Sequence, residues 1–170
     1  MAPLSILEYP DERLRQPAEP VTRFDAELRH LADAMIETLH ATGSAIGLCA
    51  TQVGTPLRML VMDVSPERDA PRVFVNPRVL ARGGYGIAEE TCLSVPDLTI
   101  HRLRPMQVAA EWQDLRGDVH GEELAGLPAV CLLHELDHFA GELLVDHMLF
   151  GRLRYDWRRK RRKPTVATTA

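Results

Sequence analysis

His134-Glu135-Leu136-Asp137-His138 forms the pattern HExxH inside an apolar segment that begins at Pro128. If this segment is helical, the two histidines project from one face about 6 Å apart, so both can bind the same metal ion. Glu135 lies roughly 100° around the helix from His134, where it can reach a water on that metal but cannot complete the ligand set. The stretch therefore predicts a central helix that carries two metal ligands and a general base.

The third protein ligand is not found downstream of this pattern. Metalloproteases with HExxH take it from a histidine six residues after the second ligand, or from a glutamate on a later helix. Leu144 occupies the first of these positions, and Glu142 is the last glutamate of the chain. Upstream, Cys92 offers a thiolate that would leave the fourth position open to water, as in catalytic metal sites. A buried free cysteine with no metal is the alternative.

Length and composition indicate one ordinary globular domain. The chain has 170 residues, of which 45% are hydrophobic and 26% charged, and this length can bury roughly 70% of the unfolded surface. No apolar run approaches the roughly 18 residues of a membrane span, and the N-terminus lacks the features of a secretory signal. Three widely spaced cysteines are typical of free or metal-bound thiols. We expect a cytoplasmic protein without membrane contact, with a single domain over residues 1–163 and a disordered tail over residues 164–170.

Charge is distributed unevenly along the chain. The formal net charge is −4, yet a basic segment that begins with Arg152 and ends with Lys163 contains eight basic side chains, and the acid Asp156 reduces its charge only to +7. Such a segment predicts an anionic partner, most often nucleic acid. The solvated end of a final helix explains it equally well.

Hydrophobic spacing predicts helices at both ends of the chain and strands between them. After Asp25, which can cap a helix, apolar residues recur at helical spacing up to Leu39. Strand-like runs cover residues 59–64, 73–76 and 106–112, and the glycine-rich residues 81–86 suggest a loop. This order favours an α+β fold, in which mixed or antiparallel strands surround the HExxH helix, with an N-terminal amphipathic helix and a C-terminal helix.

Three stretches resemble the three motifs of peptide deformylases, which remove the formyl group from the N-terminal methionine of new bacterial polypeptides. The family motifs are GxGxAAxQ, EGCLS and QHExDH. The chain has AIGLCATQ at 45–52, ETCLS at 90–94 and LHELDH at 133–138, in the same order and with similar spacing. The start PDERLR at residues 10–15 is also similar to the family, so the resemblance extends over nearly the whole chain. It implies a peptide-deformylase fold and a metal-dependent hydrolase.

The resemblance also implies roles for individual residues. Three side chains would bind one divalent metal ion, commonly Fe²⁺ in the family and often Zn²⁺ or Ni²⁺ after purification: Cys92, His134 and His138. Glu135 would take a proton from the attacking water and return it to the leaving amine. The side-chain amide of Gln52 and the backbone N–H of Leu93 would join the metal in stabilising negative charge on the formyl oxygen.

The pocket for the methionine side chain is implied by the same resemblance. Gly47 would crowd the metal so that acyl groups larger than formyl are excluded. The pocket would be lined by Ile46, Gly47, Leu127, Val130 and Cys131. Arg104 would pair with Asp137 and support the metal ligands from behind, although an exposed helix acid is the alternative for Asp137.

Four positions depart from the family motifs: Ala45, Cys49, Thr91 and Leu133 stand where the family has Gly, Ala, Gly and Gln. Thr91 adds a β-branched side chain beside a metal ligand, where glycine would permit a positive φ or a close approach by substrate. Leu133 removes a polar contact. None of the four removes a ligand, the base or the oxyanion donor, so we expect a competent metal site with an altered rate, substrate preference or inhibitor sensitivity.

Four functional hypotheses follow from these residues. The leading one is a peptide deformylase that acts on N-formylmethionyl nascent peptides and whose basic segment docks on ribosomal RNA. Thr91 and Leu133 motivate a second, a deformylase-like amidohydrolase that acts on another N-acyl substrate. The third is a ribosome-binding homologue with weak catalysis. A general metalloprotease is disfavoured because the downstream ligand is missing.

Overall fold

The computed structural model describes residues 3–148. Within them lie two α-helices, α1 (Ala26–Ala41) and α2 (Leu127–Phe139), and three 3₁₀ turns, η1 (Glu12–Arg15), η2 (Ala50–Val53) and η3 (Leu144–His147). The five strands are β1 (Gly47–Cys49), β2 (Met59–Met62), β3 (Arg72–Cys92), β4 (Val95–Gln113) and β5 (Val119–Ala125). The expected C-terminal helix, the basic segment and the expected disordered tail lie outside the described residues. No helix within residues 3–148 is long and apolar enough to cross a membrane.

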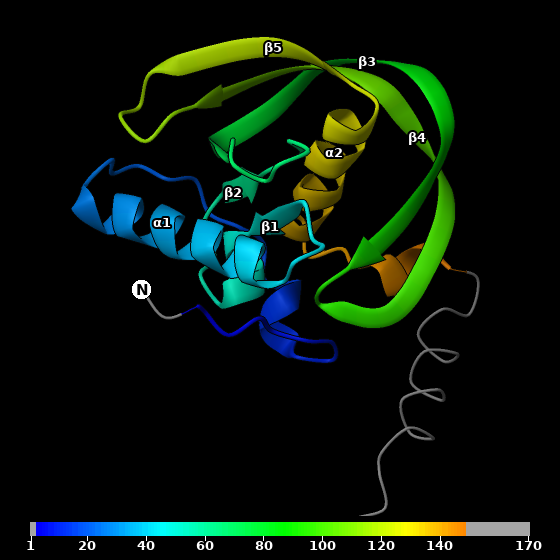
Figure 1. The fold of residues 1–170 in the computed structure, drawn as a ribbon, viewed down its shortest axis with the longest axis horizontal. Coiled ribbons are helices and arrows are strands. Elements are labelled where there is room, and N and C mark those ends of the chain that lie inside the picture. Colours follow the sequence, from blue (N-terminus) through cyan, green and yellow to red (C-terminus); the bar gives the residue numbers. More distant parts are fainter. Residues whose placement is uncertain (1–2, 149–170) are drawn as a thin grey trace, which may run out of the picture.

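The strands form one sheet in the order β1-β2-β3-β4-β5, and every neighbouring pair is antiparallel. The predicted α+β class is confirmed, with antiparallel rather than mixed pairing among these strands. Figure 1 shows β3 and β4 as a long curved ribbon that wraps around α2, while α1 lies beside β1 and β2. The central HExxH helix is therefore enclosed by the sheet.

Alternation along β2 explains why a helix lies on each side of the sheet. Successive side chains of a strand point to opposite faces. Leu60 and Met62 pack in the core around α2, whereas Met59 and Val61 pack in the core around α1. All four side chains are buried, so this short strand is apolar on both faces.

The ends of the two helices follow from local chemistry. At the start of α1 the Asp25 carboxylate accepts a hydrogen bond from the backbone N–H of Leu28, as predicted for its cap. At the start of α2 Pro128 occupies the first turn, where its missing N–H costs nothing. After α2 the chain turns at Gly141 with φ +75°, and a Cβ there would meet the carbonyl oxygen of Arg15 at 2.5 Å. Only glycine fits that turn.

The loop predicted at residues 81–86 is wrong, because these residues belong to β3. They pair with β4 through partners such as Ala81 with Ala109 and Tyr85 with Pro105. Glycine suggested a turn, but in a strand it also permits bends, and the register shifts on either side of Val79. The runs at residues 73–76 and 106–112 are therefore parts of much longer strands.

Candidate active site and metal centre

Cys92, His134 and His138 come together where the end of β3 meets α2. Their possible ligand atoms all lie within 4.8 Å of one another. Cys92 Sγ is 3.1 Å from His138 Nε2, and the two imidazole centroids are 5.1 Å apart. One thiolate and two imidazoles on adjacent elements form a donor set that fits a divalent first-row ion.

The electrostatic environment of this cluster favours the thiolate of Cys92, which is the form that binds a metal. Burial opposes ionisation of Cys92, but the positive charge of His138 and hydrogen bonds to both histidines lower its pKa to about 5. Burial also opposes protonation of His134, yet its hydrogen bonds to Cys92 and Glu90 raise its pKa well above the usual range. A thiolate therefore exists at neutral pH, and a metal cation would replace the imidazolium charge that stabilises it.

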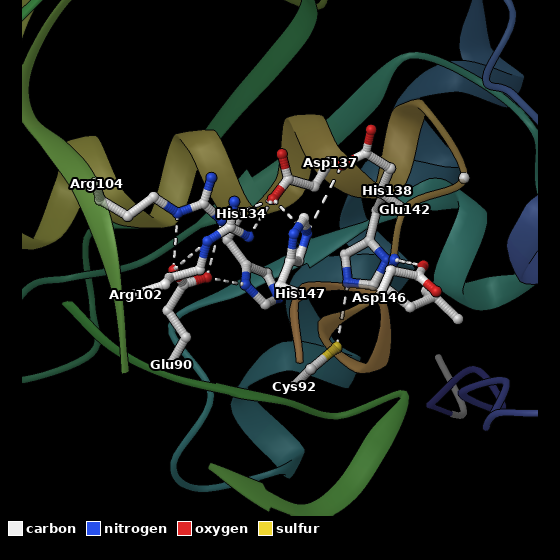
Figure 2. Close-up of polar contacts among 12 residues, drawn as sticks. Glu90, Cys92, Arg102, Arg104, His134, Asp137, His138, Glu142, Asp146 and His147 are labelled. Atoms are coloured by element: carbon white, nitrogen blue, oxygen red, sulfur yellow. Dashed lines mark hydrogen bonds and ion pairs between the residues drawn. The ribbon is translucent and has the colours of Figure 1, made fainter. Parts of the chain in front are cut away.

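A buried ion-pair network holds His134 from behind, and Figure 2 shows its members arranged along α2. Glu90 Oε2 lies 2.9 Å from His134 Nδ1, and Arg104 donates to both oxygens of Glu90, from Nε at 2.7 Å and from Nη2 at 2.9 Å. Arg104 Nη2 also donates to Asp137 Oδ2 at 2.7 Å, the pairing expected from the sequence. Arg102 donates to the same oxygen at 3.1 Å.

Glu90 stays ionised in this network. Burial opposes its ionisation, but the hydrogen bonds from Arg104 and His134 lower its pKa to about 2. Because a carboxylate only accepts hydrogen bonds, Nδ1 of His134 must carry the proton. Its Nε2 is then the nitrogen available to a metal.

Sequence reasoning missed Glu90 and Arg102, although strand alternation could have revealed them. Glu90 stands two residues before Cys92, and Arg102 stands two residues before Arg104, so each pair shares one face of its strand. Glu90 and Arg104 are buried and ionisable, and such groups need partners. The presence of Glu90 on the face of β3 that carries Cys92, and of two arginines on one face of β4, could therefore have predicted an ion pair between the strands.

Glu135 is enclosed beside the ligands. Burial raises its pKa, although the charges of His134 and His138 act in the opposite direction. Its Oε2 atom is buried and has no hydrogen-bond partner within residues 3–148. A Cβ on Gly47 would lie 2.5 Å from Glu135 Oε1 and 2.6 Å from Cys131 Sγ, so the glycine provides the space for the carboxylate.

Gln52 is fixed with its amide nitrogen toward Cys92. Its Oε1 accepts a hydrogen bond from the backbone N–H of Cys49 at 3.0 Å. Its Nε2 donates to Ser94 Oγ at 3.1 Å and to Cys92 Sγ at 3.6 Å. Leu93 directly follows Cys92 and lines the same cavity.

A cavity of about 490 Å³ opens beside these groups. Its wall includes Gln52, Cys92, His134 and Glu135. All five residues expected to form the methionine pocket also line it: Ile46, Gly47, Leu127, Val130 and Cys131. Two of the three ligands, the carboxylate, the amide and an apolar wall thus face one space, whereas His138 is buried.

The departures from the motifs leave this arrangement intact. Thr91 is an exposed residue of β3 that pairs with Thr99 and does not have a positive φ, so the expected backbone conflict does not arise. Leu133 is buried in the core around α2. Cys49 is buried 2.8 Å from Thr51 Oγ1. Burial raises the pKa of both Cys49 and Cys131, which therefore stay protonated thiols.

Comparison with known proteins gives a consistent result. The family model Polypeptide deformylase matches residues 3–151. The chain is 42% identical over 170 residues to the peptide deformylase of Novosphingobium aromaticivorans, covering 87% of this chain and 90% of that protein. It is 45% identical over 148 residues to the peptide deformylase of Chromobacterium violaceum, covering 87% and 88%.

Solved structures show the same likeness. A peptide deformylase from Legionella pneumophila superimposes with a TM-score of 0.85 at 36% identity, covering 96% of this chain and all of that one. A peptide deformylase from Ehrlichia chaffeensis in complex with actinonin gives a TM-score of 0.87 at 32% identity, covering 97% and 100%.

Proposed function

Because the chain belongs to the polypeptide deformylase family, whose activity is removal of the N-formyl group from nascent polypeptides, we propose that this hydrolysis takes place at Cys92, His134 and His138. The chain is thus a peptide deformylase. The donor set of one thiolate and two imidazoles supports the binding of one divalent metal ion. When bound, such an ion supplies a Lewis acid that polarises a carbonyl oxygen and lowers the pKa of water.

We assign the proton transfers to Glu135. Its buried carboxylate, with a raised pKa and an unpartnered oxygen, suits a base that accepts a proton from the attacking water and passes it to the leaving amine. As the formyl C–N bond breaks, formate leaves and the peptide gains a free N-terminal amine.

Gln52 and Leu93 would meet the charge that develops on the formyl oxygen. The Gln52 amide is held by its own hydrogen bonds, so its N–H does not have to reorient during the reaction. The backbone N–H of Leu93 would be the second donor. Together they stabilise negative charge that is larger in the transition state than in the substrate.

The backbone of the substrate would lie between two strand edges. The cavity is bordered by residues 44–47, which lead into the edge strand β1, and by residues 89–93 at the end of β3. An extended peptide can pair with such edges through main-chain hydrogen bonds. Its methionine side chain would pack against the apolar wall of the cavity, which includes Ile46, Val130 and Cys131.

Two further parts of the proposal rest on the sequence. We infer Fe²⁺ as the physiological metal from the family resemblance, with Zn²⁺ or Ni²⁺ as substitutes, in a cytoplasmic enzyme. The basic segment from Arg152 to Lys163 carries +7 and would dock on ribosomal RNA. Co-sedimentation with ribosomes should weaken when these charges are neutralised and when salt is raised.

The assignment rests on one observation: Glu135 lines the same cavity as Cys92 and His134, and the possible ligand atoms of His138 lie within 4.8 Å of those two ligands. The test is release of formate from formyl-Met-Ala-Ser by protein loaded with Fe²⁺ under anaerobic conditions. Glu135→Gln should lower kcat by about 10²–10⁴-fold while metal content stays at one ion per chain. Glu123→Gln, an exposed substitution on β5, should leave kcat unchanged. Equal rates for Glu135→Gln and the wild-type protein would refute the assignment.

A further inference from the structure

The outer face of the ribbon formed by β3 and β4 carries exposed apolar side chains next to the cavity. Tyr85, Ile87 and Leu103 are 65%, 67% and 62% exposed, and we call these three residues the ribbon patch. Ile87 pairs directly with Leu103 across the two strands, and Tyr85 pairs with Pro105. Large apolar side chains that cluster on a surface often mark a binding site.

The ribbon patch contributes nothing to the core. Along this part of β3, alternation directs Ala88 and Glu90 inward, where both are buried, and Ile87 and Glu89 outward. The inward face already contacts α2, because Glu90 is hydrogen-bonded to His134 and Arg104 to Asp137. An outward polar residue would fold equally well, so the apolar character of the patch calls for a contact outside the fold.

The edge of β3 beside the patch is open. β2 pairs with β3 only from Arg72 to Val75, and within residues 3–148 no other strand pairs with that edge toward Cys92. Figure 1 shows β3 and β4 continuing together well beyond β2, and β5 pairs with β4 on the side away from this edge. A peptide that leaves the cavity can therefore extend along this edge as an added strand.

The substrate is long enough to reach the patch. The cavity follows β3 from Leu93 back to Glu89, a length of about 13 Å that matches about four residues of extended peptide. From Glu89 to Tyr85 is a further length of about 13 Å, again about four residues. Because the formyl end lies near Cys92, the substrate would run antiparallel to β3, from Leu93 toward Tyr85.

We propose that the ribbon patch binds apolar side chains at alternate positions of the nascent polypeptide, at about its fifth to eighth residues. This inference rests on the proposed function, because it takes the direction of the substrate from the metal ligands. Side chains on one face of a strand neighbour those of the next strand at about 5 Å, whereas the intervening residues point to the other face. The patch therefore contacts only one of the two sets of alternate side chains of the peptide, either those at positions 5 and 7 or those at positions 6 and 8.

The test compares formylated decapeptides that begin Met-Ala-Ser. One has Leu at positions 5 and 7, a second has Leu at positions 6 and 8, and a third has Ser at all four. With the wild-type enzyme, one Leu peptide should have a kcat/KM about tenfold above the Ser peptide, and the other should gain less than twofold. The double variant Ile87→Thr/Leu103→Thr places threonine, which has a good strand propensity, at both positions and should abolish the difference.

Two controls make the result decisive. Formyl-Met-Ala-Ser ends before the patch, so the double variant should hydrolyse it at the wild-type rate, which also shows that the variant is folded. Val119→Thr removes an equally exposed apolar side chain at the start of β5 and should leave the peptide preference intact. No preference among the decapeptides, an equal gain in both registers, or a wild-type dimer that the double variant dissociates would each overturn the proposal. Failure of wild-type protein to release formate from formyl-Met-Ala-Ser would instead refute the proposed function, and the ribbon-patch proposal with it.

Discussion

Gly47→Ala should slow the reaction by displacing the catalytic carboxylate. The added Cβ would lie 2.5 Å from Glu135 Oε1, a separation that real Cβ atoms do not adopt. The carboxylate must therefore retreat by at least about 0.5 Å, and by about 0.9 Å to reach an ordinary contact. The backbone does not oppose the change, since Gly47 does not have a positive φ.

This displacement of the Glu135 carboxylate predicts how far the rate of deformylation should fall. A misplacement of about 1 Å in a catalytic group costs about 10²-fold, so kcat/KM for formyl-Met-Ala-Ser should fall by about two orders of magnitude. The same overpacking should lower the free energy of unfolding by about 1–3 kcal/mol, measured by urea denaturation. Metal content should stay at one ion per chain, because the atoms nearest to the new methyl group belong to Glu135 and Cys131 and to none of the three ligands.

Two variants test whether the loss of rate comes from displacement of Glu135 or from a general loss of stability. Gly83→Ala on β3 would place its Cβ no closer than 3.8 Å to Gln107 and should keep full activity. Gly47→Ala/Cys131→Ala removes the second close contact, 2.6 Å from Sγ, while keeping the one with Glu135. It should regain stability without regaining rate. A Gly47→Ala enzyme that is fully metallated and within threefold of the wild-type rate would refute the reasoning.

Two other predictions concern charges that the fold holds in place. Glu90→Gln removes the carboxylate that fixes the proton on His134 Nδ1, and should weaken metal binding about 10–100-fold in a chelator competition; Glu89→Gln, on the exposed face, should not. Asp63 is buried, and although burial opposes ionisation, hydrogen bonds from Ser65 and His40 lower its pKa. A lowered folded-state pKa contributes stability above the unfolded value of about 3.9 that is lost as pH falls through the folded value. Urea denaturation below pH 4 should therefore show a steeper loss of stability for the wild-type protein than for Asp63→Asn, and parallel curves would contradict this.

The sequence predicted the parts of the fold whose signal is local. Helix α1 could be recognised from its apolar stripe and the cap at Asp25, and the central helix from the HExxH pattern. The length of β3 could not, because its glycines at 83, 84 and 86 look like a turn in isolation. They lie in a strand because β4 pairs with them along the whole ribbon, and this pairing is a tertiary effect that propensity does not contain.

The residues of the site, like the elements of the fold, could be predicted from the sequence only in part. Residues with distinctive chemistry, such as Cys92 and Glu135, could be proposed from the sequence, and the structure brings them to one cavity. The role of Glu90 became evident only from the structure, in which Arg104 of β4 donates a hydrogen bond to its carboxylate. Thr91 suggested a backbone conflict that the structure removes, because this residue does not have a positive φ, but Thr91 does line the cavity, where it can contact substrate. Whether a side chain points toward the site or away from it depends on register, which the sequence did not specify.

The ion-pair network behind His134 is better explained by catalysis than by stability. Buried ion pairs often add little to stability, since the cost of removing two charges from water offsets their attraction. Glu90, Arg104 and Asp137 could in principle be replaced by apolar side chains of similar volume. Such a core would leave Nδ1 of His134 without an acceptor, and the ring would be free to rotate or change tautomer. The network keeps one carboxylate ionised, with a pKa of about 2, and so keeps the proton on Nδ1, which leaves Nε2 as the nitrogen that can give up its proton and bind a metal.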